Sequence, residues 1–346
     1  MQTLYRRGFN LGAISDTSSS KSDPIENWNL GKPLVISDAV VSEIQDYGSQ
    51  IKETESLVTA ILEGEDCAEV FSKPPYQERI ESRFLPLGSA SNQGDDQEID
   101  MLLFDMQVGS NQVLEDLWMK VSWLSFHEDD ASMRFRFSFG VDLEEDVAAD
   151  ADRQSAAADL AEVVFPESKL VSGNTRLIKQ ITDATGIEVP SFVERILYFN
   201  APGGGAYLHH DMERGHAGVV YAQVSGDTFW LALPQTELIN EIRVFINQDI
   251  SSLTDLSDSE KLELTTLASA PEQLEAALNS FDHDLLIGLI NETPQFIAHL
   301  IAAGHSRILK AGDVILLPQI DQSSCCWHSV FCLGDEIGQA LSFAIK

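Results

Sequence analysis

Two histidines and an aspartate in this sequence could together bind a metal ion. Residues Leu208–Asp211 are predicted to form a strand, and because side chains alternate between its faces, His209 and Asp211 point the same way while His210 points to the other face. Much further along the chain, His328 follows a second strand-like segment. Two imidazoles and one carboxylate on one side of a metal leave positions open for dioxygen and a substrate, which is typical of non-haem Fe(II) oxygenases.

The other residues that could bind a metal have simpler interpretations. His328 has three cysteines near it, but their spacing fits no usual pair of zinc ligands. His210 and His216 are predicted to lie at the surface or to hydrogen-bond a metal ligand. A structural role is expected of three histidines in or beside a helical region, namely His283, His299 and His305.

The composition is that of a globular protein with a strongly acidic charge. The 346 residues include 22 Lys and Arg against 55 Asp and Glu, a formal net charge of −33. The resulting field repels nucleic acid and anionic lipid, which excludes free nucleic acid as a direct partner, whereas a basic peptide or protein would be attracted. A soluble acidic surface without such a partner is the simpler alternative.

Neither secretion nor membrane insertion is indicated by the sequence. No apolar run reaches the length of a membrane span, and Met1–Asn10 lacks the apolar stretch of a secretory signal. The four cysteines are too few and too unevenly placed for a disulfide framework. We therefore expect a cytoplasmic protein that does not associate with membranes.

The elements that would position the metal ligands are mainly strands. Residues 1–25 are polar, serine-rich and predicted to be a flexible tail, whereas 26–346 are predicted to form one domain with a helical insertion at 237–305. The insertion would serve as a lid or as the contact of a homodimer. An amphipathic helix is predicted at Val113–Trp123. Strands are predicted at Gly31–Ile36, Ile99–Val108, Met133–Gly140, Phe192–Phe199, Ala206–Asp211, Val219–Val224, Thr228–Leu233, Gly312–Leu317, His328–Leu333 and Gln339–Ile345.

Four pieces of the sequence occur in an order that matches a known family. They are Gly205–Asp211 with its His-x-Asp, Ala222–Gly226 followed by Trp230 and Pro234, Gly312–Pro318 followed by Trp327 and His328, and Leu341–Phe343. With these pieces the chain resembles the Jumonji-C, or cupin-like, family of Fe(II)- and 2-oxoglutarate-dependent oxygenases. The resemblance implies a mainly β fold with helices (α+β), a double-stranded β-helix in which two antiparallel sheets face each other as a jelly-roll barrel.

The resemblance also implies an activity. Fe(II) would be held by His209, Asp211 and His328, with 2-oxoglutarate and O2 as cosubstrates, and a peptide, protein side chain or small metabolite would be hydroxylated or demethylated. Two alternatives stay open. One is a non-catalytic or 2-oxoglutarate-independent cupin-like module that binds a metal, and the other is cupin chemistry with a different metal.

The residues that hold the far carboxylate of 2-oxoglutarate in this family are changed here. Their positions correspond to Thr228, Ala206, Ser138 and Ser342, and none of these side chains is a cation. A carboxylate buried without a positive partner is costly, so a substitute is expected. Tyr198 is a polar-tipped aromatic near the predicted pocket, where it would contact the cosubstrate or pack in the core.

One predicted strand offers such a substitute. Arg134 and Arg136 share a face with Ser138 and could reach the pocket. Alternatively, the phenylalanines between them would point inward and leave the arginines in water. Arg195 and Lys310 are the other candidate cations. The predicted cosubstrate contacts are accordingly Thr228, Ser342, Tyr198 and Arg136.

Overall fold

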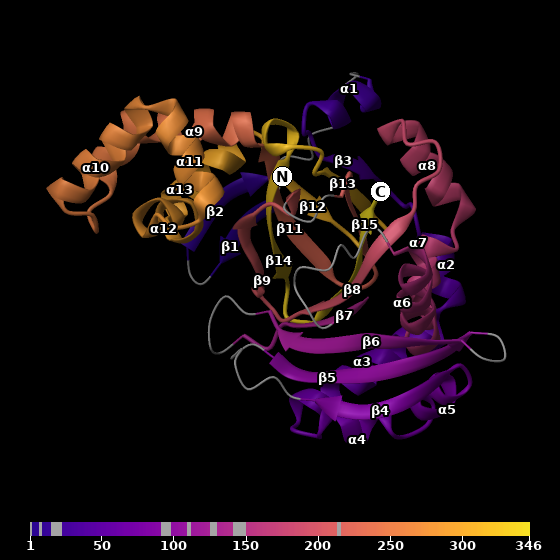
Figure 1. Cartoon of the computed structure of the whole chain (residues 1–346). Coiled ribbons are helices and arrows are strands. Elements are labelled where there is room, and N and C mark those ends of the chain that lie inside the picture. The colour runs from indigo at the N-terminus through magenta and orange to yellow at the C-terminus, as the bar shows by residue number, and fades with distance from the viewer. Residues whose placement is uncertain are drawn as a thin grey trace.

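Two antiparallel sheets face each other (Figure 1). The computed structural model describes residues 2–6, 9–14, 23–90, 98–108, 112–124, 130–140, 150–212 and 216–346. The large sheet has the strand order β3 (Leu34–Ile36), β13 (Val314–Pro318), β10 (Gly218–Gln223), β15 (Gly338–Ile345), β8 (Phe192–Asn200), β7 (Met133–Phe139), β6 (Gln112–Trp123), β5 (Glu98–Val108) and β4 (Phe84–Ala90). The small sheet has the order β12 (Ser306–Leu309), β11 (Asp227–Pro234), β14 (Cys326–Leu333) and β9 (Gly205–His209).

The path of the chain between the sheets defines the fold. From β8 to β15 the chain passes from one sheet to the other at every connection except that between β11 and β12. Side chains of both sheets meet inside, with Tyr221 and Ile315 of the large sheet packing with Trp230 and Val330 of the small one. This arrangement is a double-stranded β-helix, so the predicted fold class is confirmed.

The turn at residues 225–227 connects the two sheets. Its predicted flanking strands β10 and β11 are both present, but they do not pair with each other. Strand β10 lies between β13 and β15, whereas β11 lies between β12 and β14. Gly226 has φ +67°, and a Cβ at this position would meet the backbone of Gly338. Any other residue there would therefore be strained.

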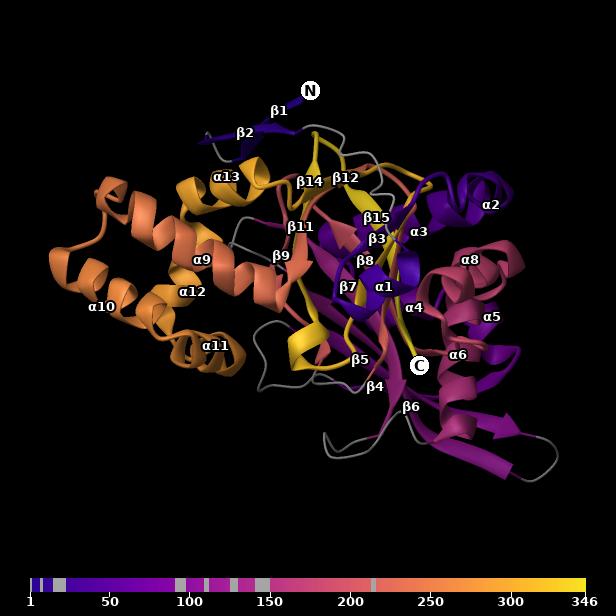
Figure 2. The same ribbon diagram turned by 90° about the horizontal axis from the view of Figure 1, so that it is seen from above.

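A layer of helices covers the outer face of the large sheet (Figure 2). It contains α2 (Val41–Asp46), α3 (Gly48–Leu62), α4 (Cys67–Phe71), α5 (Tyr76–Glu81), α6 (Ala151–Val164), α7 (Lys169–Ser172) and α8 (Thr175–Thr185). On β7, Phe135 and Phe137 point into this layer and meet Phe165 edge-on, with ring centroids 5.2 and 5.8 Å apart. The alternative in which these phenylalanines fill the barrel is therefore wrong, and the arginine face of β7 lies on the opposite side.

Strand β6 occupies the segment where a helix was expected, so that prediction is wrong. Its residues Leu117, Met119 and Val121 are buried at every second position, as in a strand with one face on a core. Asp116 has φ +62°, and the register against β5 shifts nearby. Such a bulge changes which face the following residues occupy, and the combined apolar pattern imitates a helical period.

Five helices lie between β11 and β12 and cover the outer face of the small sheet, on the left of Figure 2. They are α9 (Gln235–Asp249), α10 (Asp258–Ser269), α11 (Pro271–Ser280), α12 (Asp284–Glu292) and α13 (Pro294–Ala302). Apolar residues of these helices, such as Phe245 and Phe296, share one core with Phe229 and Trp327 of the sheet. No single described helix is long and apolar enough to cross a membrane, although α12 and α13, bent by 60°, meet the length and composition test as a pair.

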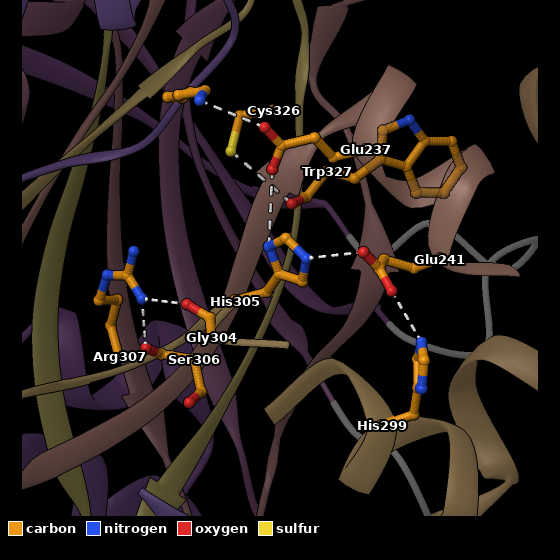
Figure 3. A network of polar contacts seen from close by, with 10 residues as sticks. Glu237, Glu241, His299, Gly304, His305, Ser306, Arg307, Cys326 and Trp327 are labelled. Carbon is orange, nitrogen blue, oxygen red and sulfur yellow. Dashed lines mark hydrogen bonds and ion pairs between the residues drawn. The ribbon is translucent and has the colours of Figure 1, made fainter. Parts of the chain in front are cut away.

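Polar contacts hold these helices to one another and to the barrel (Figure 3). Glu241 of α9 accepts a hydrogen bond of 2.7 Å from His299 of α13, and its other oxygen lies 3.5 Å from His305. Glu237 lies 3.7 Å from His305 and 3.3 Å from the ammonium of Lys32. The two histidines thus have the structural role that was expected of them.

The first residues of the chain form a hairpin rather than a loose tail. Strand β1 (Gln2–Arg6) pairs with β2 (Phe9–Ile14), and Leu4, Leu11 and Ile14 are buried in the core shared with α13. The prediction of a flexible segment is wrong for these strands, while residues 1, 7–8 and 15–22 lie outside the described part of the chain. Three apolar side chains spaced along a polar sequence were enough to attach the hairpin to α13.

One buried carboxyl group should make the stability of the fold depend on pH. Glu167 is fully buried, with Oε1 accepting a hydrogen bond of 2.6 Å from Thr54 and no partner for Oε2 among the described residues. Burial raises the pKa of Glu167 above its ordinary value of 4.5, since desolvation disfavours the charged form. The folded state therefore prefers the protonated acid. Its stabilising contribution is complete below about pH 4.5 and is lost as pH rises through the raised pKa.

We predict that Glu167→Gln removes this pH dependence. The free energy of unfolding of the variant should rise relative to that of the wild type as pH increases from 4.5 to 8, because the amide does not ionise. Urea unfolding at a series of pH values measures the difference. The exposed Glu188→Gln is the control and should show no such trend. A constant difference between wild type and Glu167→Gln across this range would contradict the prediction.

Candidate metal centre

The pairing of β9 with β14 brings the two predicted histidine ligands together. His209 at the end of β9 stands directly opposite His328 on β14, and their ring centroids are 4.4 Å apart. Asp211 lies just beyond the end of β9 and faces both rings, with Oδ1 3.8 Å from Nε2 of His209 and Oδ2 3.6 Å from Nε2 of His328. One ligand atom from each of the three residues lies within 4.8 Å of the others.

Hydrogen bonds to the backbone determine which nitrogen of each histidine is available. Nδ1 of His209 donates to the carbonyl oxygen of Tyr207 over 2.6 Å, and Nδ1 of His328 donates to that of Cys326 over 3.2 Å. A carbonyl oxygen can only accept, so the proton is on Nδ1 and the lone pair of Nε2 is directed toward Asp211. Two Nε2 atoms and a carboxylate oxygen aimed at one point fit a divalent metal, and iron(II) in particular.

The protonation state of His328 also suits a metal ligand. The side chain is buried, and desolvation together with the nearby His209 lowers its pKa to about 4, while Asp211 acts in the opposite direction. A neutral imidazole is the form that binds a metal ion. Among the described residues, no other group of three His, Cys, Asp or Glu side chains has such geometry, so the cysteines near His328 form no zinc site of this kind.

Glycine at the first position of β9 allows the close pairing that positions His209. Gly205 has φ +154°, and a Cβ there would clash with the carbonyl oxygen of Val330 on β14. A Cβ at Gly204 would clash with the side chains of Asp130 and Ser132. On the other edge of β9, Asn291 of α12 accepts a hydrogen bond of 2.7 Å from the backbone N–H of Leu208. The strand that carries His209 is thus held from both sides.

The three ligands open into a cavity of about 270 Å³ between the two sheets. Aromatic side chains form much of its wall, including Tyr198, Tyr221 and Trp230. The Trp230 ring is stacked 6.0 Å from that of His328 and meets Tyr221 edge-on at 4.6 Å. The wall also includes polar and charged side chains, such as Glu194 and Ser342, and in binding sites for small molecules such groups fix the orientation of the ligand.

The predicted cosubstrate contacts divide into two groups. Ser342 and Tyr198 line the cavity, and Arg134, which was weighed as an alternative anchor, lines it as well. Thr228 does not, because its hydroxyl is buried between Gln223, to which it donates over 2.7 Å, and Trp230, from which it accepts over 2.9 Å. Its position does not support a contact with a cosubstrate.

The remaining cations lie outside the cavity. Arg136 forms an ion pair of 2.5 Å with Glu194, so its position does not support the predicted contact either. Arg195 packs over the ring of Phe343 on the face of the sheet that meets the helices, and Lys310 is exposed. Of the cationic side chains considered from the sequence, Arg134 is the one that the fold brings to the cavity.

Asn200 and Phe281 are among the cavity residues that were not foreseen. Asn200, at the end of β8, is fully buried and lines the cavity. Phe281 follows α11 in a left-handed conformation with φ +53°, and its ring stacks on Trp327 with centroids 5.2 Å apart. His210 is buried rather than at the surface, and its ring lies 5.6 Å from that of Phe281 and 5.1 Å from that of Trp327. The sequence carries no signal for Phe281, since its place depends on how the helices pack on the small sheet.

We predict that Gly205→Ala damages both the fold and the metal centre. The added methyl group must displace β14, which should lower the free energy of unfolding by roughly 1–3 kcal/mol. Metal affinity should fall too, because His209 and His328 would no longer stand opposite each other. Urea unfolding and titration with Co(II) measure the two effects. Gly288→Ala in α12 is the control, because a Cβ there meets nothing within 4 Å. Wild-type metal affinity in Gly205→Ala would refute the expected coupling.

Comparisons with known proteins find similarity in structure only. No protein-family model and no curated protein sequence matches the chain. An oxidoreductase of the 2OG-Fe(II) oxygenase family from Burkholderia pseudomallei aligns at 10% identity over 70% of this chain and 72% of its own, with TM-score 0.29. The Escherichia coli ribosomal oxygenase YcfD aligns at 10% identity over 79% of this chain but 44% of its own, with TM-score 0.26. OsALKBH1 aligns at 10% identity over 63% of this chain and 81% of its own, with TM-score 0.27. The chain thus spans about half of the length of YcfD.

Proposed function

We propose that this protein is a non-haem Fe(II), 2-oxoglutarate-dependent oxygenase that hydroxylates or demethylates a peptide, protein side chain or small metabolite. The observation that carries the proposal is the convergence of His209, Asp211 and His328 at one cavity. Their available ligand atoms lie within 4.8 Å of one another. The set of two imidazoles and one carboxylate on one side leaves coordination positions open for other ligands.

The residues at the cavity would have separate roles in the proposed reaction. His209, Asp211 and His328 would hold the metal, and backbone carbonyls keep both imidazoles in the required tautomer. When bound, iron with O2 and 2-oxoglutarate supplies the conversion of a substrate C–H to C–OH, coupled to formation of succinate and CO2. Aromatic side chains of the wall, including Trp230 and Tyr221, would limit the access of water to the reacting groups.

The charge of the protein indicates which partners the proposed enzyme would bind. A net charge of −33 favours a basic peptide or protein as the substrate and disfavours nucleic acid and membranes. Phe281 lies at the wall of the cavity and is 40% exposed, so helices α9–α13 would contribute to substrate contact. We propose a cytoplasmic location, with these helices acting as a lid or as the contact of a homodimer.

One observation favours the second candidate, a metal-binding module that does not use 2-oxoglutarate. The position on β11 where the resembled family has a cation holds Thr228, and its hydroxyl is fully engaged with Gln223 and Trp230. A carboxylate bound on the β11 side of the cavity would therefore meet no positive charge from this position. The two candidates therefore differ in whether 2-oxoglutarate binds at all.

Metal and cosubstrate binding test the proposal directly. We predict that His209→Ala, Asp211→Ala and His328→Ala each weaken Fe(II) or Co(II) binding by more than about 100-fold, because loss of a ligand costs more than loss of a group that supports one. His283→Asn is the control, since His283 caps α12 away from the cavity. Wild-type metal affinity in any of the three alanine variants would contradict the assignment.

The same preparations separate the two candidates. Under anaerobic conditions, 2-oxoglutarate chelated to the Fe(II) protein should produce a weak visible charge-transfer band, and with O2 and a substrate the protein should form succinate. If the metal binds but no band appears at millimolar 2-oxoglutarate, the metal-binding module is favoured.

A further inference from the structure

The cavity contains a cation whose position suits a carboxylate. Arg134 lies on β7 with its side chain in the cavity wall, opposite in direction to Phe135, which is buried against the helices. In the register of the sheet it stands beside Tyr198 of β8, which also lines the cavity. Arg134 is the one Lys or Arg among the described residues that line the cavity.

The arginine is held in an orientation that leaves its binding edge available. Its Nε donates a hydrogen bond of 2.9 Å to the hydroxyl of Ser122, a buried residue opposite it on β6. Among the described residues, the guanidinium forms this one hydrogen bond, which leaves its two terminal amino groups available. A guanidinium held at Nε presents these amino groups as a planar fork that matches a carboxylate.

The other charges of the cavity do not compete for Arg134. Glu194 lines the cavity, but it forms an ion pair with Arg136. Asp211 faces His209 and His328 at the metal centre. An anion entering this region would therefore find Arg134 as its positive partner.

A second polar group at the same wall has an incomplete set of hydrogen bonds. Asn200 is 1% exposed, its Oδ1 has no partner among the described residues, and its Nδ2 lies 3.5 Å from the hydroxyl of Tyr221. Rotation of the amide by 180° would let Tyr221 donate to Oδ1 and would direct the amide N–H groups into the cavity. Asn200 can then donate to an anion bound at Arg134.

We propose that Arg134, assisted by Asn200, forms a carboxylate-binding subsite that takes the distal carboxylate of a dicarboxylic 2-oxo acid. The 2-oxo acid end of this ligand faces the metal centre, so the inference rests on the proposed function. It replaces the anchor on β11, where Thr228 lies outside the cavity and accepts a hydrogen bond from Trp230, with one on β7. Arg134 is then the residue that allows the cosubstrate to bind, which distinguishes an oxygenase from a module that binds metal alone.

The test compares two ligands that differ in the distal carboxylate. Binding of 2-oxoglutarate and of 2-oxobutyrate to the anaerobic Fe(II)-loaded protein is measured by calorimetry and by the charge-transfer band. Arg134→Gln should weaken the binding of 2-oxoglutarate by roughly 10- to 100-fold, because charge-assisted hydrogen bonds to its carboxylate are lost. Binding of 2-oxobutyrate should change by less than about threefold, since it lacks the group that Arg134 contacts. Arg134→Lys should recover only part of the loss, because an ammonium lacks the fork.

Two controls separate the subsite from general effects. Lys310→Gln removes one positive charge from an exposed position outside the cavity and should leave both affinities unchanged. Co(II) affinity and the thermal midpoint of Arg134→Gln should match those of the wild type, because Arg134 does not touch the metal ligands. Asn200→Ala should weaken the binding of 2-oxoglutarate but not that of 2-oxobutyrate, and its effect should be smaller than that of Arg134→Gln.

The outcomes that overturn the inference are distinct from those that overturn the proposed function. If the wild type binds both 2-oxo acids and Arg134→Gln leaves 2-oxoglutarate unchanged, or weakens both ligands equally, the subsite is refuted and the oxygenase proposal stands. If the wild type loads metal but binds neither 2-oxo acid, both are refuted. If Lys310→Gln weakens 2-oxoglutarate as much as Arg134→Gln, the effect is one of overall charge and the subsite is refuted.

Discussion

The antiparallel pairing of β9 with β14 is the constraint on which the site depends. It places His209 opposite His328, and the two residues that follow His209 carry the chain back so that Asp211 faces both rings. The pairing requires glycine at 205, because a Cβ there would collide with the backbone of Val330 on β14. Two segments far apart in the sequence therefore form one ligand set, with both histidines on strands and Asp211 two residues beyond the end of β9.

The barrel is stabilised mainly from outside, which leaves its interior available for polar groups. One large apolar cluster joins the large sheet to helices α2–α8, and another joins the small sheet to α9–α13 and the N-terminal hairpin. The apolar cluster between the sheets is smaller and borders the cavity. Because the outer cores bury most of the apolar surface, the inner wall can hold Arg134, Asn200 and the metal ligands.

The sequence was sufficient for those parts of the structure that follow from local patterns. The strands β8–β11 and β13–β15 and the helical region between β11 and β12 follow from periodicity and turn residues. Strand β12 was not predicted, and β9 ends at His209, so Asp211 lies beyond the strand that was expected to carry both ligands. The failures occurred where tertiary context decides. The bulge at Asp116 gives β6 an apolar pattern that resembles that of a helix. The hairpin β1–β2 is held by packing on α13. Neither the bulge nor the partner helix can be recognised within the segment itself.

Strand β7 shows why the anchor could not be chosen from sequence. Alternation places its arginines on one face and its phenylalanines on the other, but it does not say which face meets the barrel. In a sheet with one face on solvent, the phenylalanines would point inward and the arginines outward. Here helices bury the outer face, so the phenylalanines point outward into them, and Arg134 turns toward the barrel. The helices covering the sheet thus determine the charge inside the cavity, although none of them contributes a ligand to the metal centre.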